Sequence, residues 1–139
     1  MLLAEVYAEA GLVAPLAIPH YPPDWHLHRD AERYLGVLLD HAVEIARPPA
    51  PGDIALWRFG RCFSHGAIVV DWPIVIHAYL GRGCVLEDAA AAAWLSHIGE
   101  GRNAQPKPRP VKFFTLTRWL HVGEHCSDQQ RESPSPSFG

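Results

Sequence analysis

The sequence is poor in cysteine and in charged residues. It has three cysteines in 139 residues, and charged residues make up 19% of the chain. An odd number of cysteines at irregular spacing does not build a disulfide framework and favours synthesis in a reducing compartment. The net charge is −3 and there is no basic run, so neither nucleic acid nor a membrane surface is an expected partner.

Two kinds of hydrophobic segment are also missing. No apolar stretch reaches the length of a membrane-spanning helix. The first residues lack the basic start of a secretory signal peptide, and Glu5 and Glu9 interrupt the apolar run that such a peptide needs. We therefore expect no membrane span and synthesis without a signal peptide.

The remaining composition suits one globular domain, because hydrophobic residues make up 48% of the chain. Apolar residues recur at helical spacing at first and alternate after the Pro-rich segment 47–52. We expect an α+β domain over residues 1–120, with N-terminal helices packed on a small antiparallel β-meander, and a polar C-terminal tail over 121–139. The expected helices cover residues 2–10, 30–45 and 88–97, and the expected strands cover 53–59, the hairpin 65–79, 84–86 and 111–116.

The hairpin, HGAIVVDWPIVIHAY, carries the candidate site. Runs of β-branched residues on both sides of the segment 71–73, DWP, predict two strands joined by a three-residue turn. In that register Ala67 lies opposite His77. His65 and His77 then share a face as diagonal neighbours, roughly 7 Å or less between Cβ atoms. A turn one residue longer would place the histidines on opposite faces, as two unrelated polar positions.

Two histidines on one face suit nucleophilic catalysis, because one ring can take a proton and the other can orient it. The missing partner is a nucleophile. A thiolate forms best at the N-terminus of a helix, where the helix dipole and a neighbouring imidazolium lower its pKa. The helix over residues 2–10 is the candidate to present such an end to the histidines. Its apolar stripe begins without a capping residue, as if its first turn lay upstream of Met1.

Several segments resemble the NlpC/P60 cysteine peptidases, most closely the branch found in phage and prophage tail modules and gene transfer agents. They are SHGAIV, IHAYLG, the strand after PGD, the loop HYPPDWHLH and the segment GRGCVLED. The resemblance covers about residues 1–118 and implies a papain-like core. It implies that His65 is the general base and that His77, twelve residues later, orients it. The implied substrate is the stem peptide of bacterial peptidoglycan, and no cofactor is implied.

The same resemblance leaves the nucleophile out of the chain. Aligned on these motifs, the family cysteine falls one to three residues before Met1. Cys62 lies three residues before His65 in the same connection. Cys84 lies on a strand beyond the hairpin and Cys126 lies in the tail, so no cysteine of the chain is placed to attack. We therefore expect a phage-tail-associated stem-peptide endopeptidase domain that is inactive as given. It would be made in the bacterial cytoplasm and associated with a virion or tail tip.

Two alternatives stay open. The domain can be a non-catalytic structural or assembly component of a phage-like tail tip, in contact with other tail-tip proteins. It can also be a small domain with a structural zinc site, because thiolates and imidazoles suit tetrahedral zinc. The four candidate ligands of that site are Cys62, His65, His77 and Cys84.

Overall fold

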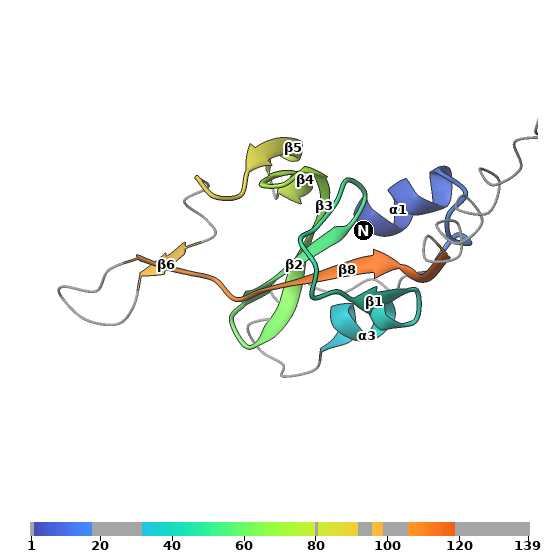
Figure 1. The fold of residues 1–139 in the computed structure, drawn as a ribbon, viewed down its shortest axis with the longest axis horizontal. Coiled ribbons are helices and arrows are strands. Elements are labelled where there is room, and N and C mark those ends of the chain that lie inside the picture. The colour runs from blue at the N-terminus through green and yellow to red at the C-terminus, as the bar shows by residue number, and fades with distance from the viewer. Residues whose placement is uncertain (1, 18–31, 80, 92–95, 99–105, 119–139) are drawn as a thin grey trace, which may run out of the picture.

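In the computed structural model, two helices pack against an antiparallel sheet (Figure 1). The structure describes residues 2–17, 32–79, 81–91, 96–98 and 106–118. The main sheet has six strands in the order β1-β8-β2-β3-β4-β5, and β6 and β7 form a separate two-stranded sheet. The expected combination of N-terminal helices and an antiparallel sheet is confirmed. The elements are α1 (Leu2–Glu9), α3 (Arg33–Leu39), β1 (Ala42–Glu44), β2 (Ile54–Phe59), β3 (Cys62–Asp71), β4 (Ile74–Tyr79), β5 (Gly83–Asp88), β6 (Ser96–Ile98), β7 (Pro106–Pro108) and β8 (Val111–Leu116).

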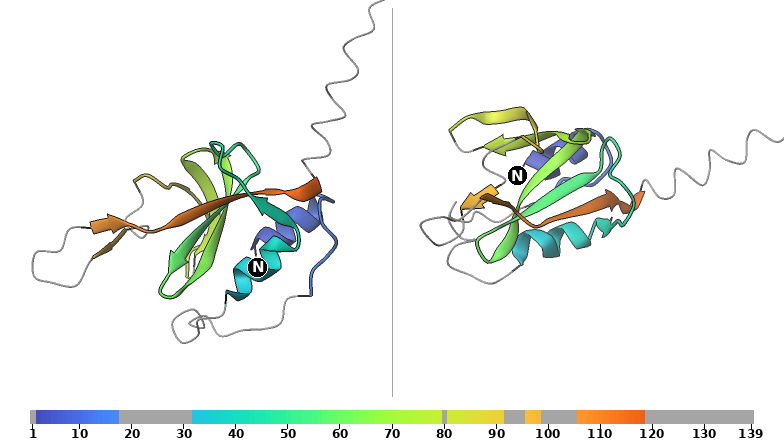
Figure 2. Two further views of the ribbon diagram at one scale, coloured as in Figure 1. Left: turned by 60° about the horizontal axis from the view of Figure 1, so that its bottom comes forward. Right: turned by 60° about the vertical axis from the view of Figure 1, so that its left-hand side comes forward.

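The two faces of the main sheet are covered differently. Helices α1 and α3 lie on one face of the main sheet, called here the helix side (Figure 2). They complete a buried cluster there with residues from several strands of the sheet. The other face, the histidine side, carries a smaller cluster of Ala, Val and Trp side chains. The helix-side cluster comprises Leu3, Tyr7, Tyr34, Leu38, Ala42, Ile54, Leu56, Cys62, Phe114 and Leu116, and the histidine-side cluster comprises Ala55, Trp57, Ala67, Val69 and Val75. No helix in the described ranges is long and apolar enough to cross a membrane.

Helix α1 ends as its sequence predicts. Gly11 adopts a left-handed conformation with φ +69°, which glycine enters without a Cβ clash. The Leu12 N–H donates to Tyr7 O at 2.8 Å and the Gly11 N–H donates to Ala8 O at 2.9 Å. This pair of bonds is a Schellman motif and satisfies carbonyls at the helix end. The Tyr7 hydroxyl donates to the Gly52 carbonyl at 2.8 Å, which ties α1 to the loop before β2.

Helix α3 is shorter than the sequence predicts. The expected helix over 30–45 stops at Leu39, and β1 (Ala42–Glu44) pairs with β8 instead. Ala42 lies opposite Leu116 and is 1% exposed, so this apolar residue is buried by the strand rather than by a helix. The edge of β8 thereby gains backbone partners, which local helical spacing does not reveal. Asp30, the first residue of the expected helix, lies outside the described residues.

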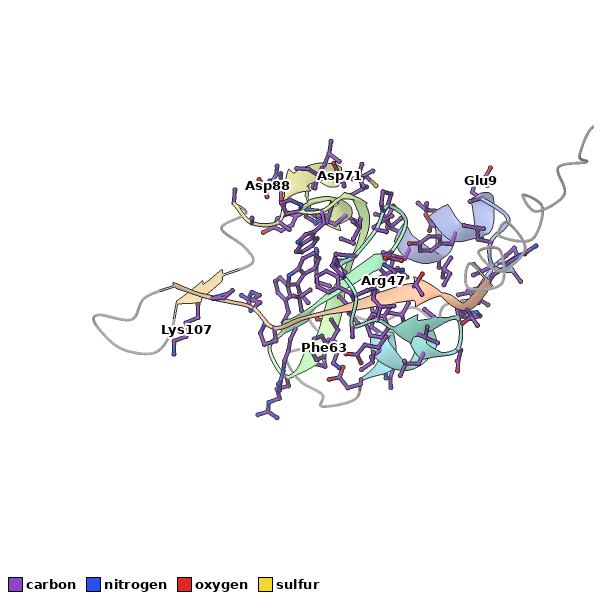
Figure 3. All side chains as sticks on the ribbon, in the orientation of Figure 1. Glu9, Arg47, Phe63, Asp71, Asp88 and Lys107 are labelled. Carbon is purple, nitrogen blue, oxygen red and sulfur yellow. The ribbon has the colours of Figure 1, made fainter. Side chains whose placement is uncertain are left out.

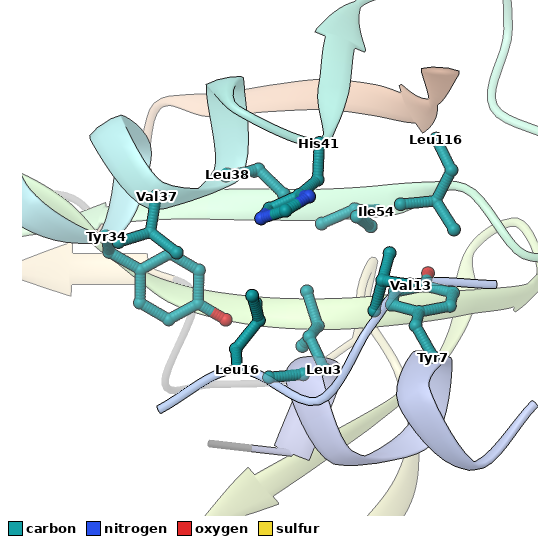
Figure 4. Close-up of a pocket in the computed structure, with 11 residues that line it drawn as sticks. Leu3, Tyr7, Val13, Leu16, Tyr34, Val37, Leu38, His41, Ile54 and Leu116 are labelled. Carbon is teal, nitrogen blue, oxygen red and sulfur yellow. The ribbon is translucent and has the colours of Figure 1, made fainter. Parts of the chain in front are cut away.

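An apolar pocket opens between the two helices on the helix side (Figure 4). Leu3 and Tyr7 of α1 line it together with Leu38 of α3 and Ile54 of β2. These four residues also belong to the helix-side cluster, so the pocket is an extension of the core. It is separate from the face that carries His65 and His77.

The hairpin has the predicted parity but a different turn. Ala67 lies opposite His77 and Val69 lies opposite Val75, as expected, but Asp71 rather than Val70 lies opposite Ile74. The turn therefore contains two residues, and Val70 is the extra residue of a β-bulge. The turn has one residue fewer than predicted and the strand has one more. The two changes cancel, so His65 and His77 still lie on the same face.

The segment after β5 also differs from the prediction. The expected helix over 88–97 is wrong, because residues 89–91 are turns and Ser96–Ile98 is a strand paired with Pro106–Pro108. Asp88, the first residue of the expected helix, still stabilises the turn, since its Oδ1 accepts from the Ala90 N–H at 2.8 Å. Figure 3 labels Asp88 and Asp71 at the same end of the sheet, where they lie on either side of Ile74, one on β5 and one on β3. The tail 121–139 lies outside the described residues.

Asp53 ties the Pro-rich segment to the start of β2. Its side chain is 1% exposed, and the carboxylate accepts from Arg47 Nη1 at 2.6 Å, Arg47 Nη2 at 3.1 Å and the Ala50 N–H at 2.7 Å. Burial by itself would raise the pKa of Asp53. The hydrogen bonds from Arg47, Ala50 and Thr115 outweigh burial, so the pKa of Asp53 lies below its ordinary value.

Candidate functional site

The candidate site is built from adjacent strands β3 and β4 in the middle of the histidine side. His65 pairs with Trp57 on β2, and His77 pairs with Ala67 on β3, so both rings project from the same face. His65 Nε2 lies 3.0 Å from His77 Nδ1, a hydrogen-bond distance. The ring centroids are 5.1 Å apart with an interplanar angle of 68°. The structure thus brings together the two histidines that the sequence places on one face.

A third polar residue, Glu87 on β5, extends this pair into a row. Its Oε2 lies 3.1 Å from His77 Nε2, and its Oε1 accepts from Arg82 Nη1 at 2.9 Å. The order His65, His77, Glu87 is that of a base, an orienter and an acceptor for the orienter. We call these three residues the His65–His77–Glu87 row.

The sequence contained a signal for Glu87 that pattern reasoning missed. The expected fourth strand ended at residue 86, one short of this carboxylate. With the turn at Gly81 to Gly83 fixed, Tyr79 lies opposite Gly83 and Val75 opposite Glu87. Glu87 then shares the face of His77 as its diagonal neighbour, by the same parity argument that joins the histidines.

The three residues of the row differ in burial, and His77 in the middle is the most buried. His77 is 0% exposed, the Glu87 side chain is 20% exposed, and His65 is half-buried. A buried imidazole is costly unless both nitrogens are bonded, and both nitrogens of His77 are. No buried side-chain nitrogen or oxygen in the described part of the chain lacks a hydrogen-bond partner.

Aromatic rings surround the outer histidine. The ring of Phe59 lies 5.1 Å from that of His65 and the ring of Trp57 lies 6.4 Å from it, measured between centroids. Trp72 stacks on Trp57 at 6.4 Å and meets Phe113 edge-on at 4.8 Å. These rings limit the directions from which a reacting group reaches His65.

The candidate zinc ligands do not converge. Cys62 is buried in the helix-side cluster, whereas His65 and His77 project from the other face. Cys84 is exposed on β5 and lies opposite Ala78, on the alternate face from His77. Across the described ranges, no three His, Cys, Asp or Glu side chains are placed to hold a metal ion. Cys126 lies outside those ranges, as do His20, His26 and His28.

Helix α1 packs on the helix side, the face of the sheet opposite to His65 and His77. Leu3, Ala4 and Tyr7 are buried, and Leu3 and Tyr7 join the helix-side cluster. That the first turn of this helix faces the histidines stays a prediction, because these contacts fix only the face of the sheet on which its apolar stripe packs. Apolar spacing shows that a helix buries one stripe against a sheet, but it does not say which face of the sheet receives the stripe.

Comparison of the chain with protein-family models, curated proteins and solved structures gives no match. Function is accordingly inferred from the geometry of the His65–His77–Glu87 row.

Proposed function

We propose that this chain carries the base and orienter of a cysteine endopeptidase of the NlpC/P60 type, associated with a phage-like tail and acting on peptidoglycan stem peptides. The observation that carries the proposal is the 3.0 Å contact between His65 and His77, twelve residues apart, with Glu87 behind them. The proposal includes a papain-like core as the fold of the domain.

In the proposed reaction, His65 takes the proton of a thiol, and the thiolate adds to the scissile carbonyl carbon. His65 then returns the proton to the leaving amine, and a thioester remains. Water, deprotonated by His65, hydrolyses the thioester and regenerates the thiol. The described cysteines do not supply this thiol, since Cys62 and Cys84 are not on the histidine side. We propose that another segment of the gene product contributes it.

The first test is the genomic sequence upstream of Met1, translated in frame. A cysteine codon within the nearest few positions supports the proposal, and an in-frame stop codon there contradicts it. The protein encoded by the extended frame is then incubated with peptidoglycan stem-peptide fragments, and cleavage is followed by mass spectrometry.

The matched variants are His65→Ala and His41→Ala. Loss of a general base lowers rates by about 10²- to 10⁴-fold, so His65→Ala should lose cleavage on this scale. His41 lines the helix-side pocket and makes no contact with the row, so His41→Ala should retain cleavage. Equal rates for the wild type and His65→Ala would contradict the proposed role of His65.

The position of α1 favours one alternative, a non-catalytic structural component of a phage-like tail tip. Helix α1 buries Leu3 and Tyr7 on the helix side, the face of the sheet opposite to the histidine row. This alternative predicts co-purification with tail-tip proteins and no cleavage by the extended protein. It also predicts that His65→Ala leaves assembly unchanged.

A further inference from the structure

We infer that Glu87 is a positioning residue that fixes which nitrogen of His65 is the base, and that Arg82 holds Glu87 in that role. The catalytic meaning of this inference depends on the proposed function, but the proton positions do not. The relevant contacts form one continuous row: Arg82 Nη1 to Glu87 Oε1 at 2.9 Å, Glu87 Oε2 to His77 Nε2 at 3.1 Å, and His77 Nδ1 to His65 Nε2 at 3.0 Å.

The direction of the row follows from Glu87. An ionised carboxylate only accepts hydrogen bonds, so His77 Nε2 must carry the proton that it shares with Glu87. A neutral imidazole has one N–H, so His77 Nδ1 is then an acceptor. His65 Nε2 must donate to it, which leaves the lone pair of His65 on Nδ1. A reacting proton is therefore taken up at Nδ1 of His65.

Arg82 makes this direction hard to reverse. It lies in the turn between β4 and β5, where Gly81 and Gly83 have φ values of +80° and +74°. Its backbone N–H donates to Tyr79 O at 3.0 Å, and its guanidinium lies over the Tyr79 ring, 5.7 Å from the centroid. A guanidinium has donors and no acceptor. To keep this bond, in which the Arg82 side chain is 55% exposed to water, residue 87 must place an acceptor at the Oε1 position.

That requirement gives the variant Glu87→Gln an unusual prediction. The glutamine carbonyl should turn to Arg82, and its NH₂ group should face His77 Nε2. His77 Nε2 then becomes an acceptor, His77 Nδ1 donates to His65 Nε2, and His65 carries its proton on Nδ1. A substitution of almost the same size should thus invert both tautomers and remove the basic nitrogen from the reacting position.

The test uses the chain as it stands, labelled with ¹⁵N in its histidine rings and studied by NMR at about pH 8, where an imidazole is ordinarily neutral. In the wild type we expect His65 and His77 both to be protonated at Nε2. In Glu87→Gln we expect both to be protonated at Nδ1, and Glu87→Asp should keep the wild-type pattern because it remains an acceptor.

Glu44→Gln is the matched control, because Glu44 is also paired with a cation across two strands, with Lys112 Nζ at 2.8 Å. It should leave both tautomers unchanged. The amide spectrum of each variant shows whether it is folded. A folded Glu87→Gln protein that keeps Nε2–H on both rings would overturn the inference, whatever the outcome of the cleavage assays.

If the extended protein cleaves stem peptides, Glu87→Gln should lower kcat by about 10³- to 10⁴-fold with little change in KM, the size associated with a base held in the wrong tautomer. Glu87→Asp should recover part of that loss. Inverted tautomers without any cleavage by the wild type would support the inference and contradict the proposed function. Cleavage that is insensitive to an inverted row would contradict a role for Nδ1.

Discussion

The helix side and the histidine side are two faces of the same strands, yet they are built for different tasks. On the helix side, large side chains such as Ile54, Leu56 and Phe114 are completely buried. On the histidine side, Ala55 and Ala67 are equally buried but small, which leaves room for the imidazole rings and their aromatic neighbours. A strand such as β2, buried over its first four residues, can therefore pack a core on one face and support a polar row on the other.

The largest effect on stability is expected from the helix side. Phe114 is completely buried there, so Phe114→Ala should lower the free energy of unfolding by about 3–5 kcal/mol. The neighbouring residue, Phe113, points to the histidine side and is half-buried, so Phe113→Ala should cost clearly less. Urea denaturation measures both. Equal losses would contradict the assignment of the core to the helix side.

An added methyl group at Gly66, the residue after His65, should also destabilise the packing on the helix side. A Cβ on Gly66 would overlap Tyr34 Oη and lie 2.8 Å from Tyr34 Cζ. Gly66→Ala should therefore cost about 1–3 kcal/mol, the usual range for overpacking. Tyr34→Phe in the same background should recover part of the loss, measured by thermal unfolding. Gly36→Ala, which meets nothing within 4 Å, should not destabilise α3.

Asp53 allows a test of pH dependence outside the row. Because the pKa of folded Asp53 is lowered, its contribution is present above the ordinary aspartate pKa of about 3.9 and is lost as pH falls toward the folded value. Asp53→Asn should cost about 1–3 kcal/mol at pH 7. The difference from the wild type should shrink at pH 3, as measured by denaturant titration. A difference that grows on acidification would show the opposite sign of the pKa shift.

The smallest effect is expected on the histidine side. His77→Leu replaces a completely buried polar ring with an apolar side chain, and the polar groups that lose a bond, on Glu87 and His65, are partly exposed and can bind water instead. We expect a change in unfolding free energy within about 1 kcal/mol. A loss as large as that of Phe114→Ala would mean that the row is part of the structural core.

Local pattern predicts much of this molecule and fails where distant segments decide. Alternating residues predict β2 and β8, and the spacing of twelve places His65 and His77 on one face. Ala42–Glu44 forms a strand because its backbone pairs with the edge of β8, some seventy residues later in the chain. Glu87 joined the row through strand register, and the side on which α1 packs depends on the whole sheet. Each of these needs a long-range partner that no short window of sequence contains.

The two irregularities of β3 have an evolutionary consequence. One falls between Phe63 and His65 against β2, and the other falls at Val70 against β4. Between them, residues 65–68 keep a regular register with β2, and residues 67–69 keep a regular register with β4. A single-residue insertion at either bulge lengthens an irregularity that already exists, whereas one at Gly66 would turn His65 away from His77. Related chains should therefore vary in length at the two bulges and keep a constant length between them.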